Sequence, residues 1–541
     1  MKMATFDSLA ARLRFEFSPV DPAEIDGGFD ENIAETISLL ESENITVTDY
    51  LEGLEHIVVD EAQDVTGERK LLVASLLRHV SPSCGITTFA DLAQAIYGFN
   101  ERDMEDGKTP SLWDALCDDQ SMNFRSLSLT VDHRTRNEAL KELYANARRL
   151  LKDDSLQPEQ KYWCLREMIN DAATGTVPGI ANQDVGYSRN SMILFRSRGE
   201  LLSAATDLWC RGERARIRLT SDVTHLSPWI GAVLGTCNGT MNRAGFDAAW
   251  QEVWPPVESV TGDSAWSMLR RSAGKGGGEI SLDNLANRLS SPSPPIHFVE
   301  DVPGNRGPVL STIHGAKGRE AERVTLMLPS GRGHDGTDWD EEARVLFVGA
   351  TRACASLHVG GRQRGAGRLE SGRLWNRWRW GGADHARVQI RSEDIDCLAQ
   401  ISTGINGSGA AVASTQEHLW SLANKITPLE AVRLEDSDCF SLYEVKPGGT
   451  QGEKPVGFLT GDLMGDLWEI CNMVRGNTAH PARRIRGFWM IGARTVAARD
   501  APAIATGDLD ERYLSGRIWL APIVAGLAGV FFNDNRGSAV V

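Results

Sequence analysis

A short apolar run that ends in two carboxylates is the most informative pattern in the chain. Residues 57–59 are Ile, Val and Val, and Asp60 and Glu61 follow directly. A continuous apolar run of this kind predicts a strand buried on both faces of a parallel sheet. Ligands bind beyond the carboxyl ends of such strands, so both acids are expected at a ligand site. One carboxylate suits a hydrated magnesium ion, and the other suits the orientation and deprotonation of a water molecule.

The pattern around this strand alternates between helical and extended segments, which favours an α/β fold. The predicted elements are helices at 5–14, 32–54 and 68–79 and strands at 85–90 and 357–359. After residue 390 the pattern changes to short apolar runs separated by glycine and aspartate. These runs predict a β-rich barrel or sandwich, with a helix at 415–425.

Composition narrows the functional classes. The chain has 541 residues and a formal net charge of −16, so a nucleic-acid site would have to be a local basic groove. The nine cysteines are scattered without a C-x-x-C pair, which argues against disulfides and zinc or iron–sulfur clusters and favours the cytoplasm. The longest apolar run, 518–532, is broken by Pro522 and glycines, so buried strands are expected there and no membrane partner.

Several further blocks follow the acidic strand in a fixed order. They lie at 91–99, 129–134, 192–196, 312–320 and 341–353. The first reads D-L-A-Q-A-I-Y-G-F, and the fourth reads T-I-H-G-A-K-G-R-E. With the acidic strand, these blocks resemble the superfamily 1 DNA helicases of the UvrD/Rep/PcrA type. In the block 129–134, Asp132 and His133 replace the family's Asn-Tyr.

The resemblance implies ATP and Mg²⁺ as cofactors and assigns catalytic roles to five residues. Asp60 would coordinate magnesium, and Glu61 would be the catalytic base. Gln94 would sense the γ-phosphate, and Arg134 and Arg352 would reach that phosphate from the second domain. Guanidinium groups in such positions stabilise the charge that spreads over a transferring phosphoryl group.

The resemblance also implies binding residues. Tyr97 is expected near the nucleotide, where Gly318 and Glu320 also belong, with Glu320 at the ribose. Single-stranded DNA is expected to contact five residues, namely Thr5, Phe6, Phe99, Thr312 and His314. Phe99 would stack on a base, a contact of about 1–3 kcal/mol.

One family motif is missing from the sequence, the phosphate-binding loop G-x-x-x-x-G-K-[ST]. It should precede the block at Thr5 and Phe6, so the first ATPase domain is expected to be truncated at its N-terminus. Residues 107–109 are Gly-Lys-Thr, but Arg102 stands where the first glycine belongs, so this segment is interpreted as a surface loop. The truncation would leave an exposed sheet edge, and a second polypeptide would have to supply the loop.

Three domains follow from this interpretation. Residues 1–125 form a partial first RecA-like domain, and 126–385 form a second RecA-like domain with a helical insertion at about 205–300. Residues 390–541 form a β-rich accessory domain. The tryptophans of the insertion are expected to form a small helical core, and a base-stacking surface is the alternative.

A basic, aromatic segment, 362–380, allows two interpretations. The favoured one is an amphipathic helix whose tryptophans pack on the sheet while its arginines stay solvated. The other is a single-strand binding surface.

The expected function is ATP-driven translocation on single-stranded DNA and unwinding at duplex junctions in the 3′ to 5′ direction. Hydrolysis by this chain alone is expected to be weak, because the phosphate-binding loop is missing. The alternative is a helicase-like subunit that binds DNA or a partner protein without hydrolysing ATP. Magnesium-dependent ATPase activity stimulated by single-stranded DNA distinguishes the two.

Overall fold

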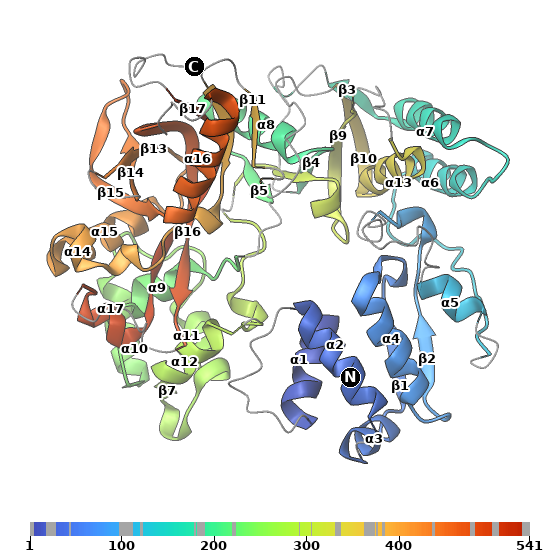
Figure 1. Ribbon diagram of the computed structural model, residues 1–541, viewed down its shortest axis with the longest axis horizontal. Coiled ribbons are helices and arrows are strands. Elements are labelled where there is room, and N and C mark those ends of the chain that lie inside the picture. Colours follow the sequence, from blue (N-terminus) through green and yellow to red (C-terminus); the bar gives the residue numbers. More distant parts are fainter. Residues whose placement is uncertain are drawn as a thin grey trace. The chain divides into compact units, whose positions relative to one another are not determined.

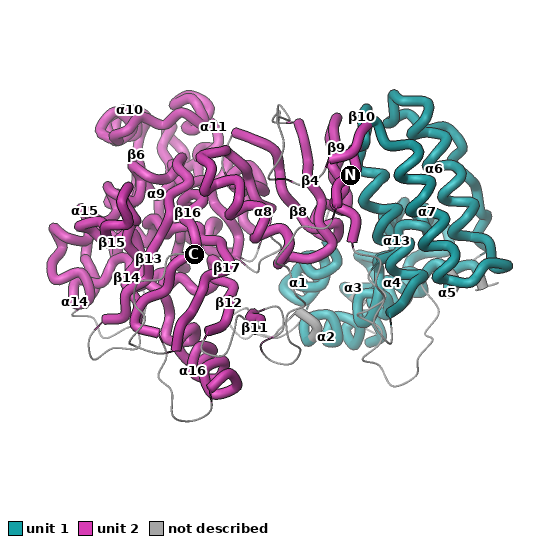
Figure 2. The backbone as a smooth tube through the Cα atoms, turned by 90° about the horizontal axis from the view of Figure 1, so that it is seen from above, with its two compact units in different colours: residues 1–174, 332–357 teal, residues 175–331, 358–541 magenta. Residues whose placement is uncertain are grey.

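A computed structural model gives the fold of the chain. It describes residues 5–17, 29–42, 45–96, 112–118, 123–177, 180, 190–218, 223–291, 293–303, 306–329, 337–361, 374, 377–380, 385–434, 439–475, 482–499 and 508–532. The chain divides into two compact units (Figure 2). Unit 1 comprises Met1–Thr174 and Arg332–Leu357, and unit 2 comprises Gly175–Gly331 and His358–Val541. The three-domain division stays a prediction.

Unit 1 is mainly helical around a short parallel strand pair. Its helices are α1 (Phe6–Phe17), α2 (Phe29–Glu41), α3 (Ile45–Glu52), α4 (Gly67–His79), α5 (Leu112–Asp118), α6 (Glu138–Leu151), α7 (Pro158–Ala172) and α13 (Trp339–Ala350). The helices expected at 5–14 and 68–79 are confirmed as α1 and α4. The helical segment expected at about 32–54 is confirmed as two helices, α2 and α3. The Ser42 hydroxyl donates to the Leu39 carbonyl at the end of α2, and such side-chain bonds compete with helix continuation.

The strand before the two acids is β1 (His56–Val59), and it pairs in parallel with β2 (Gly85–Thr88). Figure 1 shows α4 beside this pair. Val59 is buried in a cluster with residues of α4, whereas Val58, which points the other way, is 56% exposed. Burial on both faces was therefore a wrong prediction, because within the described residues only one face of the strand pair is covered.

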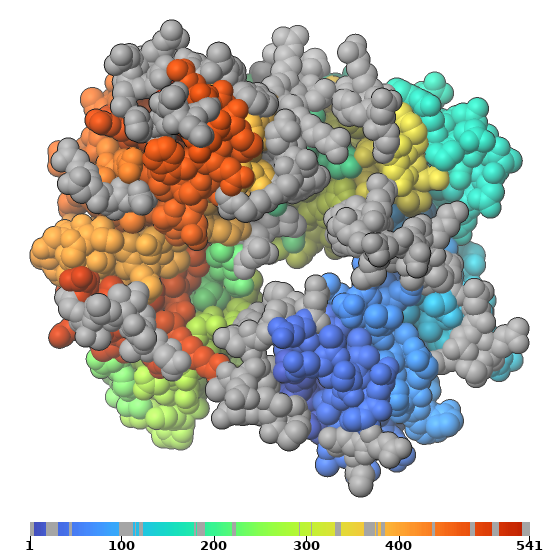
Figure 3. All heavy atoms as spheres, viewed as in Figure 1, coloured from blue at the N-terminus to red at the C-terminus, as the bar shows by residue number. Residues whose placement is uncertain are grey.

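Three helices of unit 1 form a packed group, in which α6, α7 and α13 run side by side (Figure 2). The buried Tyr144 hydroxyl of α6 lies 2.9 Å from both the Ala350 and Ala353 carbonyl oxygens at the end of α13. The Tyr162 and Trp339 rings lie 5.0 Å apart, centroid to centroid. These contacts hold both ends of α13, the start through Trp339 and the end through Ala350. On the surface of the same unit, α1 and α2 are seen in dark blue in Figure 3.

A six-stranded parallel sheet, which lies mainly in unit 2, confirms a parallel α/β component; residues 353–357 of its strand β10 belong to unit 1. Its order is β3-β10-β9-β4-β8-β5. The strands are β3 (Gly175–Val177), β4 (Ser191–Phe195), β5 (Arg216–Arg218), β8 (Val309–Thr312), β9 (Ala321–Met327) and β10 (Ala353–Gly360). All residues of β4 are buried, which explains its unbroken apolar pattern. The helix α8 (Arg198–Cys210) follows β4.

A seven-stranded antiparallel sheet lies near the C-terminus, in the order β11-β12-β17-β16-β13-β14-β15. Its strands are β11 (Trp378–Trp380), β12 (His385–Ile390), β13 (Thr427–Arg433), β14 (Phe440–Val445), β15 (Gln451–Leu459), β16 (Arg484–Ala497) and β17 (Ile518–Phe531). The β-rich prediction is confirmed, as a single sheet. Two helices lie against it, α15 (Gly409–Leu422), close to the expected 415–425, and α16 (Gly461–Arg475). Two shorter helices are α14 (Thr403–Asn406) and α17 (Glu511–Gly516); α14 and α15 are seen in orange in Figure 3.

The amphipathic helix expected within 362–380 is not found in the part of that segment that the structure describes. Residues 378–380 form the strand β11, and Arg377 is buried instead of solvated. Its guanidinium lies 2.7 Å from Asp394 and 3.1 Å from Asp466. Paired carboxylates compensate for the loss of hydration, which is why an arginine can stand here.

The helical insertion packs on the antiparallel sheet. It contains α9 (Pro228–Leu234), α10 (Arg243–Glu252), α11 (Gly262–Ala273), α12 (Leu282–Leu289) and the short pair β6 (Thr240–Met241) and β7 (Ile280–Ser281). Trp229 is buried in the core that the insertion shares with the sheet, and Trp250 and Trp266 pack against it. Trp254 departs from the expected helical core, because it is 80% exposed.

No helix within the described ranges is both long and apolar enough to cross a membrane.

Candidate functional site

The carboxyl ends of β1 and β2 are joined by backbone hydrogen bonds. Phe89 N donates to Val59 O at 2.8 Å, and Ala62 N donates to Phe89 O at 2.9 Å. Asp60 and Glu61 lie in the exposed turn between these contacts. Glu61 has a left-handed backbone (φ 53°), and its N–H donates to Asp60 Oδ1 at 3.0 Å. A non-glycine residue in this conformation is uncommon, and such residues cluster at functional sites.

Gln63 connects the acidic turn to the loop after β2. Its Nε2 donates to Glu61 Oε2, and its Oε1 accepts from Asp91 N at 3.0 Å. The side chain is buried, so both ends of the carboxamide are used where water cannot replace them. Gln63 therefore sets the orientation of the Glu61 carboxylate.

Asp91 organises the loop that carries Gln94. Its carboxylate accepts from Ala93 N at 3.2 Å, which caps the short helical turn, and from Gln94 Nε2 at 2.9 Å. From α6, Arg148 donates to the same carboxylate through Nε at 3.1 Å and Nη2 at 3.0 Å. The Arg148 guanidinium also lies over the Phe347 ring, 5.2 Å from the centroid.

Arg352 closes this network from the end of α13. Its Nη2 donates to Gln94 Oε1 at 2.9 Å and to Thr351 Oγ1 at 3.0 Å, and its Nε donates to Val348 O at 2.9 Å. Arg352 is 2% exposed, and Gln94 is also buried. Arg352 lies in unit 1 together with Gln94, Asp60 and Glu61.

A second arginine of α13 holds the same loop. Arg344 Nε donates to the Ala95 carbonyl oxygen at 2.7 Å. Hydrogen bonds therefore hold the loop after β2: one set comes from Arg148 of α6, and the other comes from Arg344 and Arg352 of α13 and its end. Displacement of α13 would be transmitted directly to Gln94, because the contacts are short and the helix is rigid.

Arg134 lies on an exposed turn of unit 1. Asp132 Oδ1 accepts from Arg134 N at 2.9 Å and from Thr135 N at 3.0 Å, so the backbone of the turn is fixed. Burial opposes the shift, but the hydrogen bonds from Thr135 and Arg134 lower the pKa of Asp132. The replacement of the family's asparagine by aspartate thus preserves the acceptor that shapes the turn.

The remaining site residues of unit 1 are the N-terminal pair and two aromatic residues. Thr5 caps α1, since its Oγ1 accepts from Ser8 N at 3.2 Å. Phe6 is partly buried against two hydrophobic clusters of unit 1. Tyr97 and Phe99 lie outside the described residues.

Four predicted site residues lie in unit 2, at the end of β8 and just after it. Thr312 Oγ1 accepts from Gly315 N at 3.0 Å and shapes the turn that carries His314. Gly318 is exposed with a left-handed backbone (φ 72°), which glycine adopts without strain, and Glu320 is exposed.

The donor set fits a magnesium ion held by a single carboxylate. No group of three or more His, Cys, Asp or Glu side chains suited to a metal occurs among the described residues. Magnesium is commonly bound by one or two carboxylates together with phosphate oxygens and water, and the exposed Asp60 can supply one such ligand. Asp60 would hold the ion, with the nucleotide phosphates completing its coordination.

Four structural residues of the site were missed from the sequence: Gln63, Asp91, Arg148 and Arg344. Asp91 and Arg344 stand inside the recognised blocks 91–99 and 341–353, and Gln63 lies two residues after the acid pair, so their position was the available signal. Arg148 resembles an ordinary solvated helix arginine in the sequence. Only the packing of α6 brings it to the loop after β2.

A parallel strand that ends in an acid pair places both acids where open α/β sheets bind their ligands. The UvrD-helicase family model, described as the UvrD/REP helicase N-terminal domain, matches residues 21–106. The resemblance predicted from the sequence is confirmed for this segment, which contains Asp60, Glu61 and Gln94. No curated protein matches the chain.

Proposed function

We propose that the protein is a helicase-family chain that couples ATP hydrolysis to 3′ to 5′ movement on single-stranded DNA. The observation that carries the proposal is the continuous hydrogen-bond network from Glu61 through Gln63, Asp91 and Gln94 to Arg352. Such a network links a water-activating carboxylate to a phosphate-sensing pair. The family match over residues 21–106 supports the same function.

In this proposal Asp60 and Glu61 divide the chemistry. Asp60 would hold a magnesium ion, which would supply positive charge for the phosphate oxygens. Glu61 orients a water molecule and accepts its proton, while Gln63 keeps the carboxylate aimed. Two RecA-like domains are parts of this proposal, with ATP bound between an acid-bearing edge and arginines.

In this proposal Gln94 and Arg352 couple the binding of the γ-phosphate to the movement of α13. Each is the hydrogen-bond partner of the other when no phosphate is bound. A γ-phosphate offers stronger, charge-assisted acceptors, so both side chains would exchange this bond for bonds to phosphate. Because Arg352 lies at the end of α13 and Gln94 lies on the loop after β2, the exchange converts phosphate binding into movement of a helix.

The polypeptide of residues 1–541 contains no G-x-x-x-x-G-K-[ST] sequence. The amides and lysine of such a loop normally position the phosphates. Positioning carries most of phosphoryl-transfer catalysis, so we infer that this polypeptide alone turns over ATP slowly and is accelerated by a polypeptide that supplies the loop. The same sequence feature favours the second candidate, a DNA- or partner-binding subunit that does not hydrolyse ATP.

The test measures ATP turnover of residues 1–541 with magnesium and saturating oligo(dT), with and without a polypeptide carrying the phosphate-binding loop. The proposal expects stimulation by both additions and loss of activity in Glu61→Gln. Glu142→Gln, which changes an exposed glutamate on α6, is the matched control and should retain activity. Absence of turnover under all conditions, combined with retained DNA binding, would favour the non-hydrolysing subunit. Strand displacement on substrates with a 3′ or a 5′ tail then tests the direction.

A further inference from the structure

The antiparallel sheet of unit 2 carries a row of mostly charged residues across five of its strands. Arg379 of β11 pairs with Arg387 of β12, and Arg387 pairs with Gly529 of β17. Gly529 pairs in turn with Arg486 of β16, which pairs with Glu430 of β13. Directly paired residues lie on the same face of a sheet, and neighbouring strands are about 4.7–4.9 Å apart. These five positions therefore form a line across one face of the sheet.

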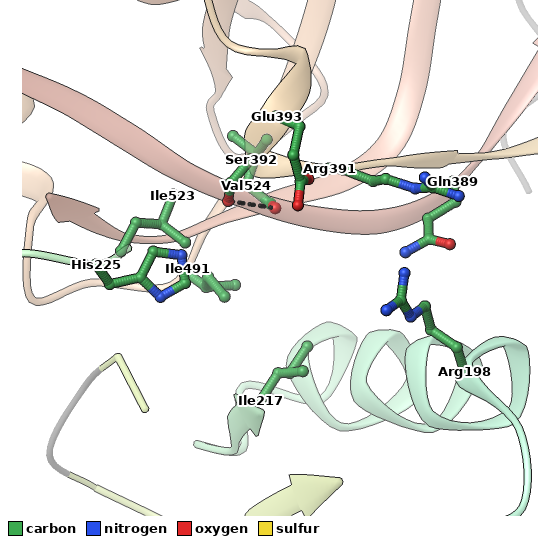
Figure 4. A pocket seen from close by; sticks show the side chains of 10 residues that line it. All are labelled: Arg198, Ile217, His225, Gln389, Arg391, Ser392, Glu393, Ile491, Ile523 and Val524. Carbon is green, nitrogen blue, oxygen red and sulfur yellow. Dashed lines mark hydrogen bonds between the residues drawn. The ribbon is translucent and has the colours of Figure 1, made fainter. Parts of the chain in front are cut away.

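The helix α8 covers another part of the same face. Ala525 and Leu527 of β17, which stand on the same face as Gly529, are buried in a hydrophobic cluster with residues of α8. Gln389 of β12 points towards Arg198 at the start of α8 (Figure 4). The row lies beyond this covered part, near the end of β17.

The arginine cluster of this face consists of Arg379, Arg387, Arg484 and Arg486. Arg484 belongs to it because it stands two residues before Arg486 on β16, and side chains two residues apart on a strand share a face. The side chains of Arg484 and Arg486 are 54% and 46% exposed, and Arg379 and Arg387 are partly exposed. The arginine cluster is therefore accessible to a ligand from solvent.

The arginine cluster holds more positive than negative charge. Arg486 Nε and Arg484 Nη1 donate to Oε1 of the buried Glu430, at 2.8 Å and 3.3 Å. The guanidinium groups of Arg379 and Arg387 have no hydrogen bond or ion pair to any other residue that the structure describes. One carboxylate therefore accompanies four guanidinium groups in the described part of this face.

Arg379 and Arg387 are a like-charged pair on neighbouring strands. Like charges that stand directly opposite each other destabilise a sheet. Burial lowers the pKa of Arg379, and the positive charge of Arg387 lowers it further. An anion bound between the two groups would remove this repulsion. The fold therefore keeps an unfavourable pair that a negatively charged ligand would make favourable.

Gly529 leaves the surface of the sheet open between Arg387 and Arg486. A Cβ at this position would meet a single described atom within 4 Å, Cε2 of Phe531 at 3.7 Å, which is an ordinary van der Waals contact. A side chain would thus fit, yet glycine leaves the backbone accessible. Glycine inside a strand often marks a site where a ligand approaches closely. A negatively charged chain can therefore lie over Gly529 with arginines on both sides.

Aromatic rings accompany the arginines and favour nucleic acid over an acidic protein as the ligand. The His385 and Phe531 rings are stacked, with their centroids 5.0 Å apart, and Tyr443 pairs with Glu430 in the same row. Guanidinium groups bind phosphates in a bidentate manner, and aromatic side chains stack on unpaired bases. An acidic polypeptide would use the arginines but not the rings. Because the whole chain has a net charge of −16, nucleic acid must be attracted by a local surface of this kind.

We propose that the arginine cluster binds the phosphates of a single-stranded nucleic acid that runs over Gly529, and that DNA is the ligand. The choice of DNA rests on the proposed function, whereas binding at this surface requires neither ATP nor a phosphate-binding loop. The arginine cluster holds DNA on the antiparallel sheet, separately from the contacts predicted for Phe99, Thr312 and His314.

The first test measures binding of fluorescein-labelled oligo(dT) to the full chain without ATP, by fluorescence anisotropy at several salt concentrations. Arg379→Gln/Arg387→Gln should bind at least tenfold more weakly than wild type. The slope of log affinity against log salt should fall by about 1.4, because each phosphate contact to a single strand contributes about 0.7. Arg271→Gln/Arg288→Gln, which removes two exposed arginines of α11 and α12, is the matched control and should bind as wild type. Equal affinity in wild type and Arg379→Gln/Arg387→Gln, or no binding by wild type, would overturn the proposal.

Thermal unfolding of the same variant distinguishes a ligand site from a structural role. Because the two arginines repel each other, Arg379→Gln/Arg387→Gln without DNA should unfold at the same temperature as wild type or at a higher one. Loss of binding together with retained or raised stability supports the proposal. A clear fall in the unfolding temperature would show that the two arginines serve the fold and would contradict it.

Gly529→Glu tests the path of the ligand. The carboxylate would stand between Arg387 and Arg486 and pair with them, so the folded sheet should be retained. Binding of oligo(dT) should fall at least tenfold, because the carboxylate repels phosphates and fills the open surface. Gly529→Gln is the neutral control and should bind more tightly than Gly529→Glu. Wild-type affinity in Gly529→Glu would contradict the proposal.

Competition identifies the class of ligand. Unlabelled oligo(dT) should displace the labelled strand from wild type, whereas poly-L-glutamate of equal total charge should not. Equal competition by poly-L-glutamate would assign the surface to acidic proteins, and at least tenfold stronger competition by oligo(rU) would assign it to RNA; either result would overturn the assignment to DNA. The proposed function is tested separately, because loss of ATP turnover in Glu61→Gln should leave DNA binding at the arginine cluster intact.

Discussion

Arg352 Nη2 donates to Gln94 Oε1 across 2.9 Å, and both side chains are buried. The two residues are far apart in the sequence and meet because α13 packs against the loop after β2. A buried arginine–glutamine bond leaves neither group hydrated, so any ligand that separates them must replace the bond. This requirement makes the pair a suitable sensor of a phosphate group.

The pair predicts a large effect of Arg352→Ala. In a preparation that hydrolyses ATP, turnover should fall by a factor on the order of 10³, as is found for arginines that stabilise phosphoryl transfer. Steady-state ATPase assays measure it. Arg125→Ala, which removes an exposed arginine of unit 1, is the control and should change little. If Arg352→Ala keeps most of its activity, Arg352 has no part in the mechanism.

Gln63 should act as a positioning residue for Glu61. Gln63→Met preserves the length of the side chain and removes both hydrogen bonds, so kcat should fall by about 10- to 100-fold while KM stays the same. A fall in stability alone, with kcat unchanged in the folded protein, would show that Gln63 serves only the fold.

Phe99 remains a prediction from its place in the block 91–99. Phe99→Ala should weaken binding of single-stranded DNA by about 5- to 150-fold, the equivalent of about 1–3 kcal/mol for one stacked base. Fluorescence anisotropy at fixed salt measures this. Phe15→Ala provides a control, because Phe15 is an exposed phenylalanine on α1. Unchanged affinity in Phe99→Ala would mean that the ring does not contact DNA.

His225 predicts a pH dependence of stability. Burial lowers its pKa to about 4, and Arg494 adds to the shift, whereas the unfolded value is 6.5. Between these values the unfolded chain binds a proton that the folded protein does not, so stability falls as the pH drops from about 6.5 towards 4. From pH 7 to pH 5 the loss from this group should be about 2 kcal/mol.

Chemical denaturation at the two pH values, followed by tryptophan fluorescence, tests the role of His225. In His225→Gln the difference between pH 7 and pH 5 should shrink by that amount. The exposed His133→Gln should behave like wild type. A pH difference that is the same in all three proteins would exclude His225 as its source.

The sequence by itself determined the two strands that meet at the acid pair and the order of the blocks. The C-terminal β-rich region was also predicted, since apolar runs and glycine-rich turns are local signals. The catalytic roles of Asp60, Glu61 and Gln94 stay predictions from their positions within short motifs. The family of residues 21–106 followed from the same local information.

Other features were decided only by tertiary structure. The exposure of Val58 depends on which face of β1 is covered, and the burial of Arg377 depends on Asp394 and Asp466, which lie far along the chain. No local pattern distinguishes an arginine in an ion pair from a solvated one.

The clearest example is the set of hydrogen bonds to the loop after β2 from Arg148, Arg344 and Arg352. Each donor is separated from its acceptor by many residues, and its geometry is set by how α6 and α13 pack. Likewise, the arginine cluster of the antiparallel sheet can be recognised only once the register of its strands is known. Short motifs in the sequence therefore predict the chemistry of the site. The pairing and burial of side chains result from long-range packing, because they depend on what surrounds a side chain in space and not on its neighbours in sequence.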